Sequence, residues 1–261
     1  MTSRRTTFAI FLAAALTLSG CKPDNAVKKG ETISNGPVPA AVAAPNPDAG
    51  SVTGTIRFTG KPPARTRIDM SMDPACAMAP GENYAEQYIV ANGKLANVYL
   101  YIKAGAPPSM APTGTAAVVL DQKGCRYTPH VIALQQGGSV EFRNSDPTMH
   151  NIHTTPSTGG APTIDVSQSP MGQPQTRQFN QAETMLPVRC NNHPWMNAFI
   201  NVSATPYFAV SAADGTFTIS GLPPGKYTLA AVHEKLPEQT LEISIPPKGT
   251  AKADFTFAAA K

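Results

Sequence analysis

The sequence predicts an all-β protein built from small β-sandwiches. Three observations support this: short alternating runs rich in β-branched residues, turn signals between these runs, and a proline content that disfavours long helices. The 261 residues include 26 Pro and 20 Gly, and 41% are hydrophobic. That hydrophobic fraction is sufficient for buried cores and argues against a disordered chain.

The N-terminal segment has the pattern of an export signal. Arg4 and Arg5 precede the apolar run Phe8–Leu18, which is too short to span a bilayer. The run ends in Leu18-Ser19-Gly20-Cys21, which resembles the lipobox of bacterial lipoproteins. The resemblance implies a signal peptide at residues 1–20 and lipidation of Cys21. The alternative is an ordinary signal peptide followed by a chance cysteine.

The lipobox resemblance also implies a location. A lipidated Cys21 anchors the chain to a membrane facing the periplasm, because two or more acyl chains give stable attachment. Lys22 stands where enterobacterial lipoproteins retained in the inner membrane carry Asp, which favours the outer membrane. Residues 21–49 contain five prolines and little periodicity, so we expect a tether that holds the folded part away from the lipid.

The rest of the chain shows repeated strand signals, beginning near Ser51. Gly137-Gly138 is expected to join two of the strands as a hairpin. The expected strands are Val52–Phe58, Ala96–Ile102, Val118–Leu120, Val131–Leu134, Ser139–Arg143, Gly215–Ser220, Lys226–Val232, Leu241–Ile245 and Ala253–Phe257.

Two separated segments carry one family resemblance. GSVTGTIRFTGKPPA at Gly50–Ala64 and DGTFTISGLPPGKYTLAAVHEKL at Asp214–Leu236 resemble the start and end of a carboxypeptidase regulatory-like (transthyretin-like) β-sandwich. The resemblance implies one such domain formed by residues 50–111 and 205–259 and interrupted by a second domain at residues 112–204. Two consecutive sandwiches are the alternative.

The interrupting segment carries the chemistry. A strand and polar turn lead to Met149-His150-Asn151. Some 37 residues later comes Pro187-Val188-Arg189, which leads directly into Cys190-Asn191-Asn192-His193-Pro194-Trp195-Met196. This pattern resembles the copper loops of plastocyanin-like cupredoxins, and the short C-x2-H-x2-M spacing is most similar to amicyanin. The resemblance implies a Greek-key β-sandwich with one mononuclear type 1 copper site, whose ligands are His150, Cys190, His193 and Met196.

These residue types suit copper for a reason independent of the resemblance. Two imidazoles and a thiolate with a weak axial thioether are acceptable to both Cu(II) and Cu(I), so little rearrangement accompanies electron transfer. One tight turn supplies three of the ligands, and the fourth comes from a separate strand.

Neighbouring residues are expected to support the site. Asn151 can hydrogen-bond across to the Cys190 loop, and Pro194 stiffens that loop and removes a donor near the sulfur. Trp195, with Met149 and Pro194, is expected to form an apolar rim around the edge of His193, where a redox partner would dock. The alternative role for Trp195 is ordinary packing in a hydrophobic core.

Other histidines and cysteines leave alternatives open. A zinc site of His150, His153, Cys190 and His193 is possible but leaves Met196 unexplained. We expect His153 to lie outside the ligand set, His130 to be structural, and His233 to be a strand-end surface residue. Cys76 and Cys125 remain after Cys21 and Cys190 are assigned, and such a pair in an exported protein most simply forms a disulfide. A second metal site using Cys125 and His130 is the alternative.

The sequence therefore predicts a periplasmic one-electron carrier and no enzyme. Without any run of Lys or Arg, nucleic-acid binding is not supported. Met70, Met72 and Met78 motivate a second hypothesis, a copper chaperone or storage protein, and core gap-filling is their alternative role. A metal-free interaction module is a third hypothesis. The oligomeric state is left open.

Overall fold

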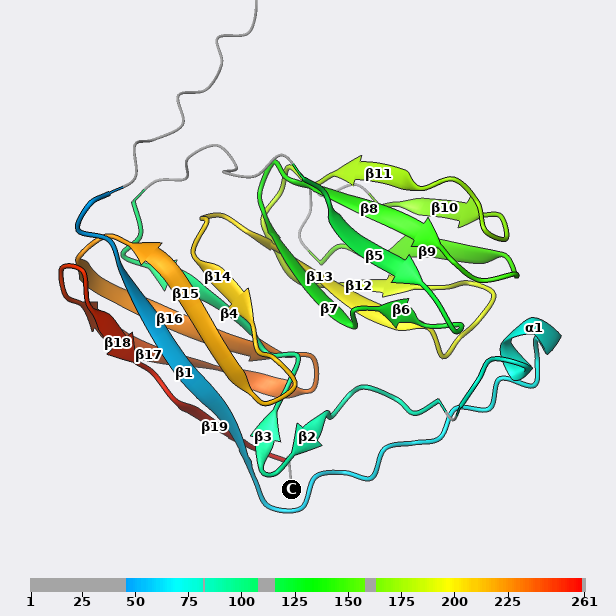
Figure 1. The fold of residues 1–261 in the computed structure, drawn as a ribbon, viewed down its shortest axis with the longest axis horizontal. Helices are drawn as coiled ribbons and strands as arrows, with labels where there is room; N and C mark the ends of the chain where they lie inside the picture. The colour runs from blue at the N-terminus through cyan, green and yellow to red at the C-terminus, as the bar shows by residue number, and fades with distance from the viewer. Residues whose placement is uncertain (1–45, 82, 108–115, 158–162, 260–261) are drawn as a thin grey trace, which may run out of the picture. The chain divides into compact units, whose positions relative to one another are not determined.

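The computed structural model describes residues 46–81, 83–107, 116–157 and 163–259 (Figure 1). Within these ranges the chain forms nineteen β-strands and one short helix, so the predicted all-β fold class is confirmed. The expected signal peptide at residues 1–20, Cys21 and the tether up to residue 45 lie outside the described residues. In the described ranges, no helix combines the length and the apolar character needed to cross a membrane.

Strands from both ends of the described chain form the first sandwich. Its two sheets share one buried core. The first sheet has the order β15 (Thr216–Leu222), β1 (Gly50–Thr59), β3 (Lys94–Leu95) and β2 (Val90–Ala91), and β18 (Thr250–Lys252) and β19 (Phe255–Ala258) also pair with β1. The second sheet has the order β14 (Phe208–Val210), β4 (Tyr99–Ala104), β16 (Gly225–His233) and β17 (Leu236–Ile245).

Strand β1 shows why this sequence forms the centre of a sheet. Its alternating apolar residues Val52, Ile56 and Phe58 are buried in the first core. Gly54 is required here, because a Cβ atom at this position would lie 1.7 Å from the carbonyl oxygen of Ala253. The strand runs antiparallel to β15 and parallel to β18 and β19. The first strand of the described chain is therefore paired directly with the last two.

The second sandwich is formed by the middle of the chain, and its inward side chains make a separate core. One sheet has the order β10 (Asp165–Gln168), β9 (His150–Thr154), β12 (Glu183–Arg189), β13 (Asn197–Ser203) and β7 (Val131–Gln135). The other has the order β11 (Gln175–Gln178), β8 (Ser139–Asn144), β5 (Val118–Gln122) and β6 (Tyr127–Thr128). In sequence it lies between β4 and β14, which are antiparallel partners in the first sandwich.

The hairpin predicted at Gly137-Gly138 is wrong. Strand β7 pairs in parallel with β13, whereas β8 pairs with β5 and β11 in the other sheet. The two glycines bond to Phe179 instead: Gly137 N donates to its carbonyl at 2.7 Å, and Phe179 N donates to the Gly138 carbonyl at 2.9 Å. The turn therefore carries the chain from one sheet to the other, which lets both strands bury apolar residues in the same core.

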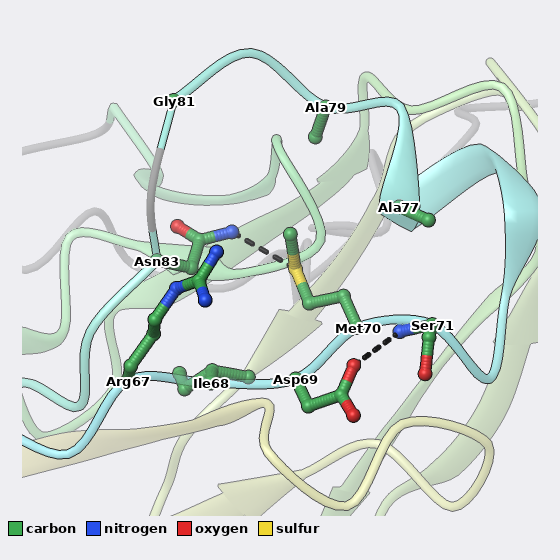
Figure 2. Close-up of a pocket in the computed structure, with 9 residues that line it drawn as sticks. All are labelled: Arg67, Ile68, Asp69, Met70, Ser71, Ala77, Ala79, Gly81 and Asn83. Carbon is green, nitrogen blue, oxygen red and sulfur yellow. Dashed lines mark hydrogen bonds between the residues drawn. The ribbon is translucent and has the colours of Figure 1, made fainter.

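Between β1 and β2 the chain makes an excursion that we call the cover segment, residues 60–81. It contains the short helix α1 (Pro74–Ala77) and buries Met70 and Cys76 in the core of the second sandwich. Cys76 forms a disulfide with Cys125, and their Cα atoms are 5.6 Å apart. In Figure 2 the side chains of this segment surround a pocket of about 380 Å³, where Asn83 donates to the Met70 sulfur. The cover segment is thus fixed to the sandwich that contains the predicted copper ligands.

Candidate metal centre

His150 is the first residue of β9 and is fully buried. The polar turn before it is held by Asn144, whose side-chain amide donates to the carbonyls of Thr148, Gln168 and Ser169 at 2.9 to 3.2 Å. Because β9 runs antiparallel to β12, its first residue lies at the end of the sheet where β12 finishes. The fold therefore brings His150 to the loop that carries the other predicted ligands.

That loop is the tight connection between the antiparallel strands β12 and β13. Cys190 N donates to the Met196 carbonyl at 3.3 Å, and Met196 N donates to the His193 carbonyl at 2.9 Å. Cys190, His193 and Met196 are all buried. The backbone bonds close the loop on itself, so its three potential ligands are offered from one compact turn.

The potential ligand atoms of His150, Cys190 and His193 converge. Nδ1 of His150 lies 2.9 Å from Nδ1 of His193, and the Cys190 sulfur lies 3.5 Å from the same His193 atom. The ligating atoms of His150, Cys190 and His193 all lie within 4.8 Å of one another. Such a spacing places all three within reach of one metal ion.

The environment of Cys190 favours its thiolate. Asn151 N donates to the sulfur at 3.3 Å. Burial opposes ionisation of the thiol, but hydrogen bonds, chiefly from His150 and the Asn151 backbone, outweigh it and lower the pKa of Cys190 to about 6. The thiolate is the form that binds a metal.

The surroundings of His150 favour the protonated form of its imidazole. Burial opposes its protonation, but hydrogen bonds with Asp146 and Cys190 outweigh that effect and raise the pKa of His150 to about 9. The pocket thus stabilises positive charge beside the sulfur. A cation bound between the imidazoles and the thiolate satisfies the same electrostatic demand.

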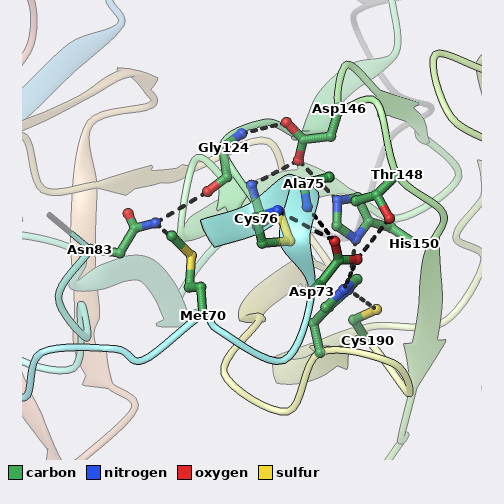
Figure 3. The surroundings of a disulfide bond; sticks show 12 residues. Met70, Asp73, Ala75, Cys76, Asn83, Gly124, Asp146, Thr148, His150 and Cys190 are labelled. Carbon is green, nitrogen blue, oxygen red and sulfur yellow. Dashed lines mark hydrogen bonds and ion pairs between the residues drawn. A yellow bond between two sulfur atoms is a disulfide. The ribbon is translucent and has the colours of Figure 1, made fainter. Parts of the chain in front are cut away.

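Each imidazole has a carboxylate on its far nitrogen. Nε2 of His150 lies 2.9 Å from Oδ2 of Asp146, and Nε2 of His193 lies 3.0 Å from Oδ2 of Asp73. Figure 3 shows both carboxylates beside the disulfide, with Thr148 directed at Asp73. Neither carboxylate was predicted from the sequence. Asp146 was within reach of such a prediction, four residues before His150 in the polar turn, whereas Asp73 is 120 residues from His193.

These carboxylates are held ionised by their surroundings. Burial raises the pKa of Asp73, but hydrogen bonds from Thr148 and His193 outweigh it and lower the pKa to about 2. Burial likewise opposes ionisation of Asp146, and the hydrogen bond with His150 lowers its pKa on balance. Each imidazole therefore has a full negative charge on its outer side.

The predicted supporting residues lie close to the site. Asn151 accepts a hydrogen bond from Asn191 N at 3.4 Å, so it spans to the Cys190 loop. Trp195 donates from Nε1 to the Cys125 carbonyl at 3.1 Å, and its ring centroid is 5.1 Å from that of His193. Pro194 is exposed. The far nitrogen of His193 faces the carboxylate of Asp73, whereas the sequence predicted an apolar rim around this edge of the imidazole.

The rival metal sites are not formed. His153 lies 3.3 Å from Asp165, and no cluster of metal-binding side chains in the described ranges contains it. Cys125 is bonded to Cys76, so it is not available to a site with His130, and His130 instead contacts Glu234 at 2.6 Å. Two further clusters, one with Cys76 and one with Cys125, share these disulfide sulfurs and are not separate sites.

His233 differs from its expected role. It was expected at the surface, but only 4% of it is exposed, because it packs against Tyr88 with ring centroids 5.6 Å apart. Burial lowers the pKa of His233 to about 4. It is far in sequence from the ligand loop and belongs to the first sandwich.

Comparisons with known proteins give likenesses to both parts of the chain. The carboxypeptidase regulatory-like domain family model matches residues 189–258, a range that contains the second segment of the predicted resemblance and also β13. Among curated proteins, no match is found.

Several solved structures are similar. A Cu(I) form of an amicyanin mutant is 21% identical, with a TM-score of 0.31, over 40% of this chain and 98% of that one. Amicyanin from Paracoccus versutus is 20% identical, with a TM-score of 0.31, over 40% of this chain and 97% of that one. A copper-containing nitrite reductase from Thermus scotoductus is 18% identical, with a TM-score of 0.31, over 57% of this chain and 28% of that one.

Proposed function

We propose that the protein is a lipid-anchored type 1 copper protein that carries single electrons in the periplasm. The observation that supports this is the convergence of the ligating atoms of His150, Cys190 and His193 within 4.8 Å of one another, with all three residues buried. Met196 is buried on the same loop and would supply a thioether to a bound copper ion. The cluster itself, rather than the distant structural likenesses, supports copper.

The donor set fits the metal. A thiolate and a thioether are soft ligands, and imidazoles suit both oxidation states, so the combination selects copper over oxygen-preferring cations. A bound copper ion supplies a one-electron Cu(II)/Cu(I) couple. Cys190, with its pKa near 6, is a thiolate at neutral pH and available for coordination without a strong base.

The chain's own residues fix the geometry in advance. His150 is held by Asp146, His193 by Asp73, and the Cys190 sulfur by the Asn151 N–H. Ligands that cannot swing away keep one geometry for both oxidation states, which lowers the reorganisation that accompanies electron transfer. The proposal includes no catalytic activity of the chain.

The proposal extends to location and partner. Lipidation of Cys21 attaches the chain to a membrane on its periplasmic side, the outer membrane being favoured, and the Pro-rich tether gives the folded part reach. A redox partner protein docks near His193, where Pro194 and Met149 are exposed. Metabolic labelling with a radioactive fatty acid tests the anchor, because Cys21→Ala should abolish incorporation.

The direct test uses the full chain purified in detergent. Addition of Cu(II) should produce an intense blue or green colour that bleaches with a mild reductant and returns on oxidation. Cys190→Ser should abolish the colour, because the charge-transfer absorption requires the thiolate. Asn180→Ser, far from the cluster, serves as the control and should stay coloured. A colourless wild type would contradict the proposal and leave a metal-free interaction module.

A copper chaperone or storage protein is the second candidate, favoured by two exposed thioethers. Met72 is 75% exposed and Met78 is 80% exposed, and both flank the buried part of the cover segment. Met70 does not belong with them, because it is buried and accepts a hydrogen bond from Asn83. Mixing the copper-loaded protein with a copper-free acceptor separates the candidates: a chaperone loses its copper to the acceptor, and an electron carrier retains it while changing oxidation state.

A further inference from the structure

The cover segment brings a carboxylate to the outer edge of His193. It leaves the first sandwich after β1 and places α1 on the second sandwich, where Cys76 is bonded to Cys125. Asp73, the residue before α1, then lies with Oδ2 3.0 Å from Nε2 of His193. A residue from outside the second sandwich thus completes the surroundings of one of its ligands.

Asp73 is fixed by contacts to both of its oxygens. Oδ1 accepts from the backbone N–H groups of Ala75 and Cys76, at 2.8 and 3.4 Å, as the N-cap of α1. Oδ2 accepts from the Thr148 hydroxyl at 2.8 Å and faces His193. Helix capping therefore uses one oxygen only, and the second is directed at the ligand.

The contact determines which nitrogen of His193 carries hydrogen. An ionised carboxylate only accepts hydrogen bonds, so Nε2 must donate to it. Nδ1 is then left with its lone pair, and it is this atom that lies 3.5 Å from the Cys190 sulfur. The side chain of His193 is only 4% exposed, so water does not compete for the bond.

From these contacts we propose that Asp73 is a positioning residue for His193, one that holds the ligand in its Nε2–H tautomer and lowers the reduction potential of the bound copper. This rests on the proposed copper function. A carboxylate hydrogen-bonded to a ligand imidazole increases the basicity of that ligand, and its negative charge stabilises Cu(II) more than Cu(I). The cover segment, fixed by the Cys76–Cys125 disulfide, is what delivers this charge.

The test compares the reduction potentials of three full-length proteins loaded with copper: wild type, Asp73→Asn and Asp69→Asn. Asp69→Asn is the matched control, because Asp69 is an exposed carboxylate on the same segment that accepts a hydrogen bond from Ser71 N at 2.9 Å. We expect Asp73→Asn to shift the equilibrium at least tenfold toward Cu(I), about 59 mV for one electron, and Asp69→Asn to shift it much less. Asp73→Glu should restore most of the wild-type potential.

The hydrogen on His193 gives a second readout, measured by nitrogen NMR on the metal-free protein. In the wild type we expect a hydrogen on Nε2 that exchanges slowly with water. Asp73→Asn keeps an acceptor oxygen and should retain it, whereas Asp73→Ala should lose it. If Asp73→Asn does not fold, Thr148→Val provides the second variant, because it removes one of the two groups that hold Oδ2, and it should shift the potential in the same direction.

The outcomes separate this inference from the proposed function. A wild type that takes up no copper overturns both. If all the proteins are coloured but Asp73→Asn has the same reduction potential as Asp69→Asn, the proposed role of Asp73 is overturned and the copper site stands. The same holds for Thr148→Val if it is used in place of Asp73→Asn. A wild type that carries the hydrogen on Nδ1 of His193 instead of Nε2 contradicts the tautomer assignment.

Discussion

Asp146 Oδ2 lies 2.9 Å from Nε2 of His150, four residues later in the chain. The same carboxylate accepts the backbone N–H groups of Gly124 and Cys125, at 2.6 and 2.8 Å. It therefore joins a predicted copper ligand to the loop that carries the disulfide. The arrangement resembles the one at Asp73 and His193. Each imidazole therefore contacts a carboxylate through the ring nitrogen that faces away from the sulfur.

Replacing Asp146 by Ala should weaken copper binding and destabilise the protein. Without the carboxylate His150 is free to rotate, and loss of such an outer partner costs roughly 10- to 100-fold in metal affinity. Two backbone N–H groups lose their acceptor as well, which costs about 2–3 kcal/mol of unfolding free energy. Copper titration and urea denaturation measure the two effects.

The control for this change is Asp121→Ala. Asp121 is a nearby carboxylate that accepts from the Ser145 hydroxyl at 2.9 Å and does not contact a predicted ligand. Its loss should change stability by about 0.5 kcal/mol or less and leave copper affinity unchanged. Equal effects of the two variants would show that Asp146 has no special connection with the site.

Removing the disulfide should destabilise the second sandwich specifically. Cys76 and Cys125 are 49 residues apart in sequence, and on the chain-entropy model a closed loop of about that length contributes about 4 kcal/mol. The double variant Cys76→Ala, Cys125→Ala avoids burying a new polar group. Trp195, the sole tryptophan of the chain, bonds to the Cys125 carbonyl, so its fluorescence reports unfolding of this region. A loss below about 1 kcal/mol would show that other contacts hold the cover segment.

The first sandwich should lose stability on acidification because of His233. Folding keeps this buried imidazole neutral, with a pKa of about 4, while the unfolded chain protonates it below the ordinary pKa of 6.5. The stabilisation is therefore complete above pH 6.5 and is lost as the pH falls from 6.5 toward 4, by up to about 3 kcal/mol. His233→Gln should reduce this slope, as measured by calorimetry of the metal-free protein across that range. Parallel curves for the two proteins would rule out His233 as the source.

Much of the fold could be predicted because its strands alternate. Val52–Phe58 and Lys226–Val232 bury every second residue, or nearly so, and both lie in observed strands. The edge strands β10 and β11 were not predicted, because DVSQ and QTRQ contain almost no apolar residues. Strand β12 contains Pro187, and a proline within a sequence argues against a central strand, so this strand was not predicted.

The site was predictable only as far as local spacing reaches. Cys190, His193 and Met196 are close in sequence, and the resemblance to cupredoxins implied His150 as the histidine followed by Asn. The bond between Asp73 and His193 depends on where the disulfide places α1, and no periodicity in the sequence encodes that placement. The hairpin error at Gly137-Gly138 has a similar origin, because the glycines allow a tight turn but do not determine whether it stays within one sheet.

X-ray absorption at the copper edge, recorded on the full chain loaded with one equivalent of Cu(II), tests the central claim most directly. The account predicts one copper per chain, bound by a single short copper–sulfur bond and two imidazole nitrogens, with the sulfur contribution lost in Cys190→Ser. A spectrum with only nitrogen and oxygen ligands, or one unchanged in Cys190→Ser, would contradict it.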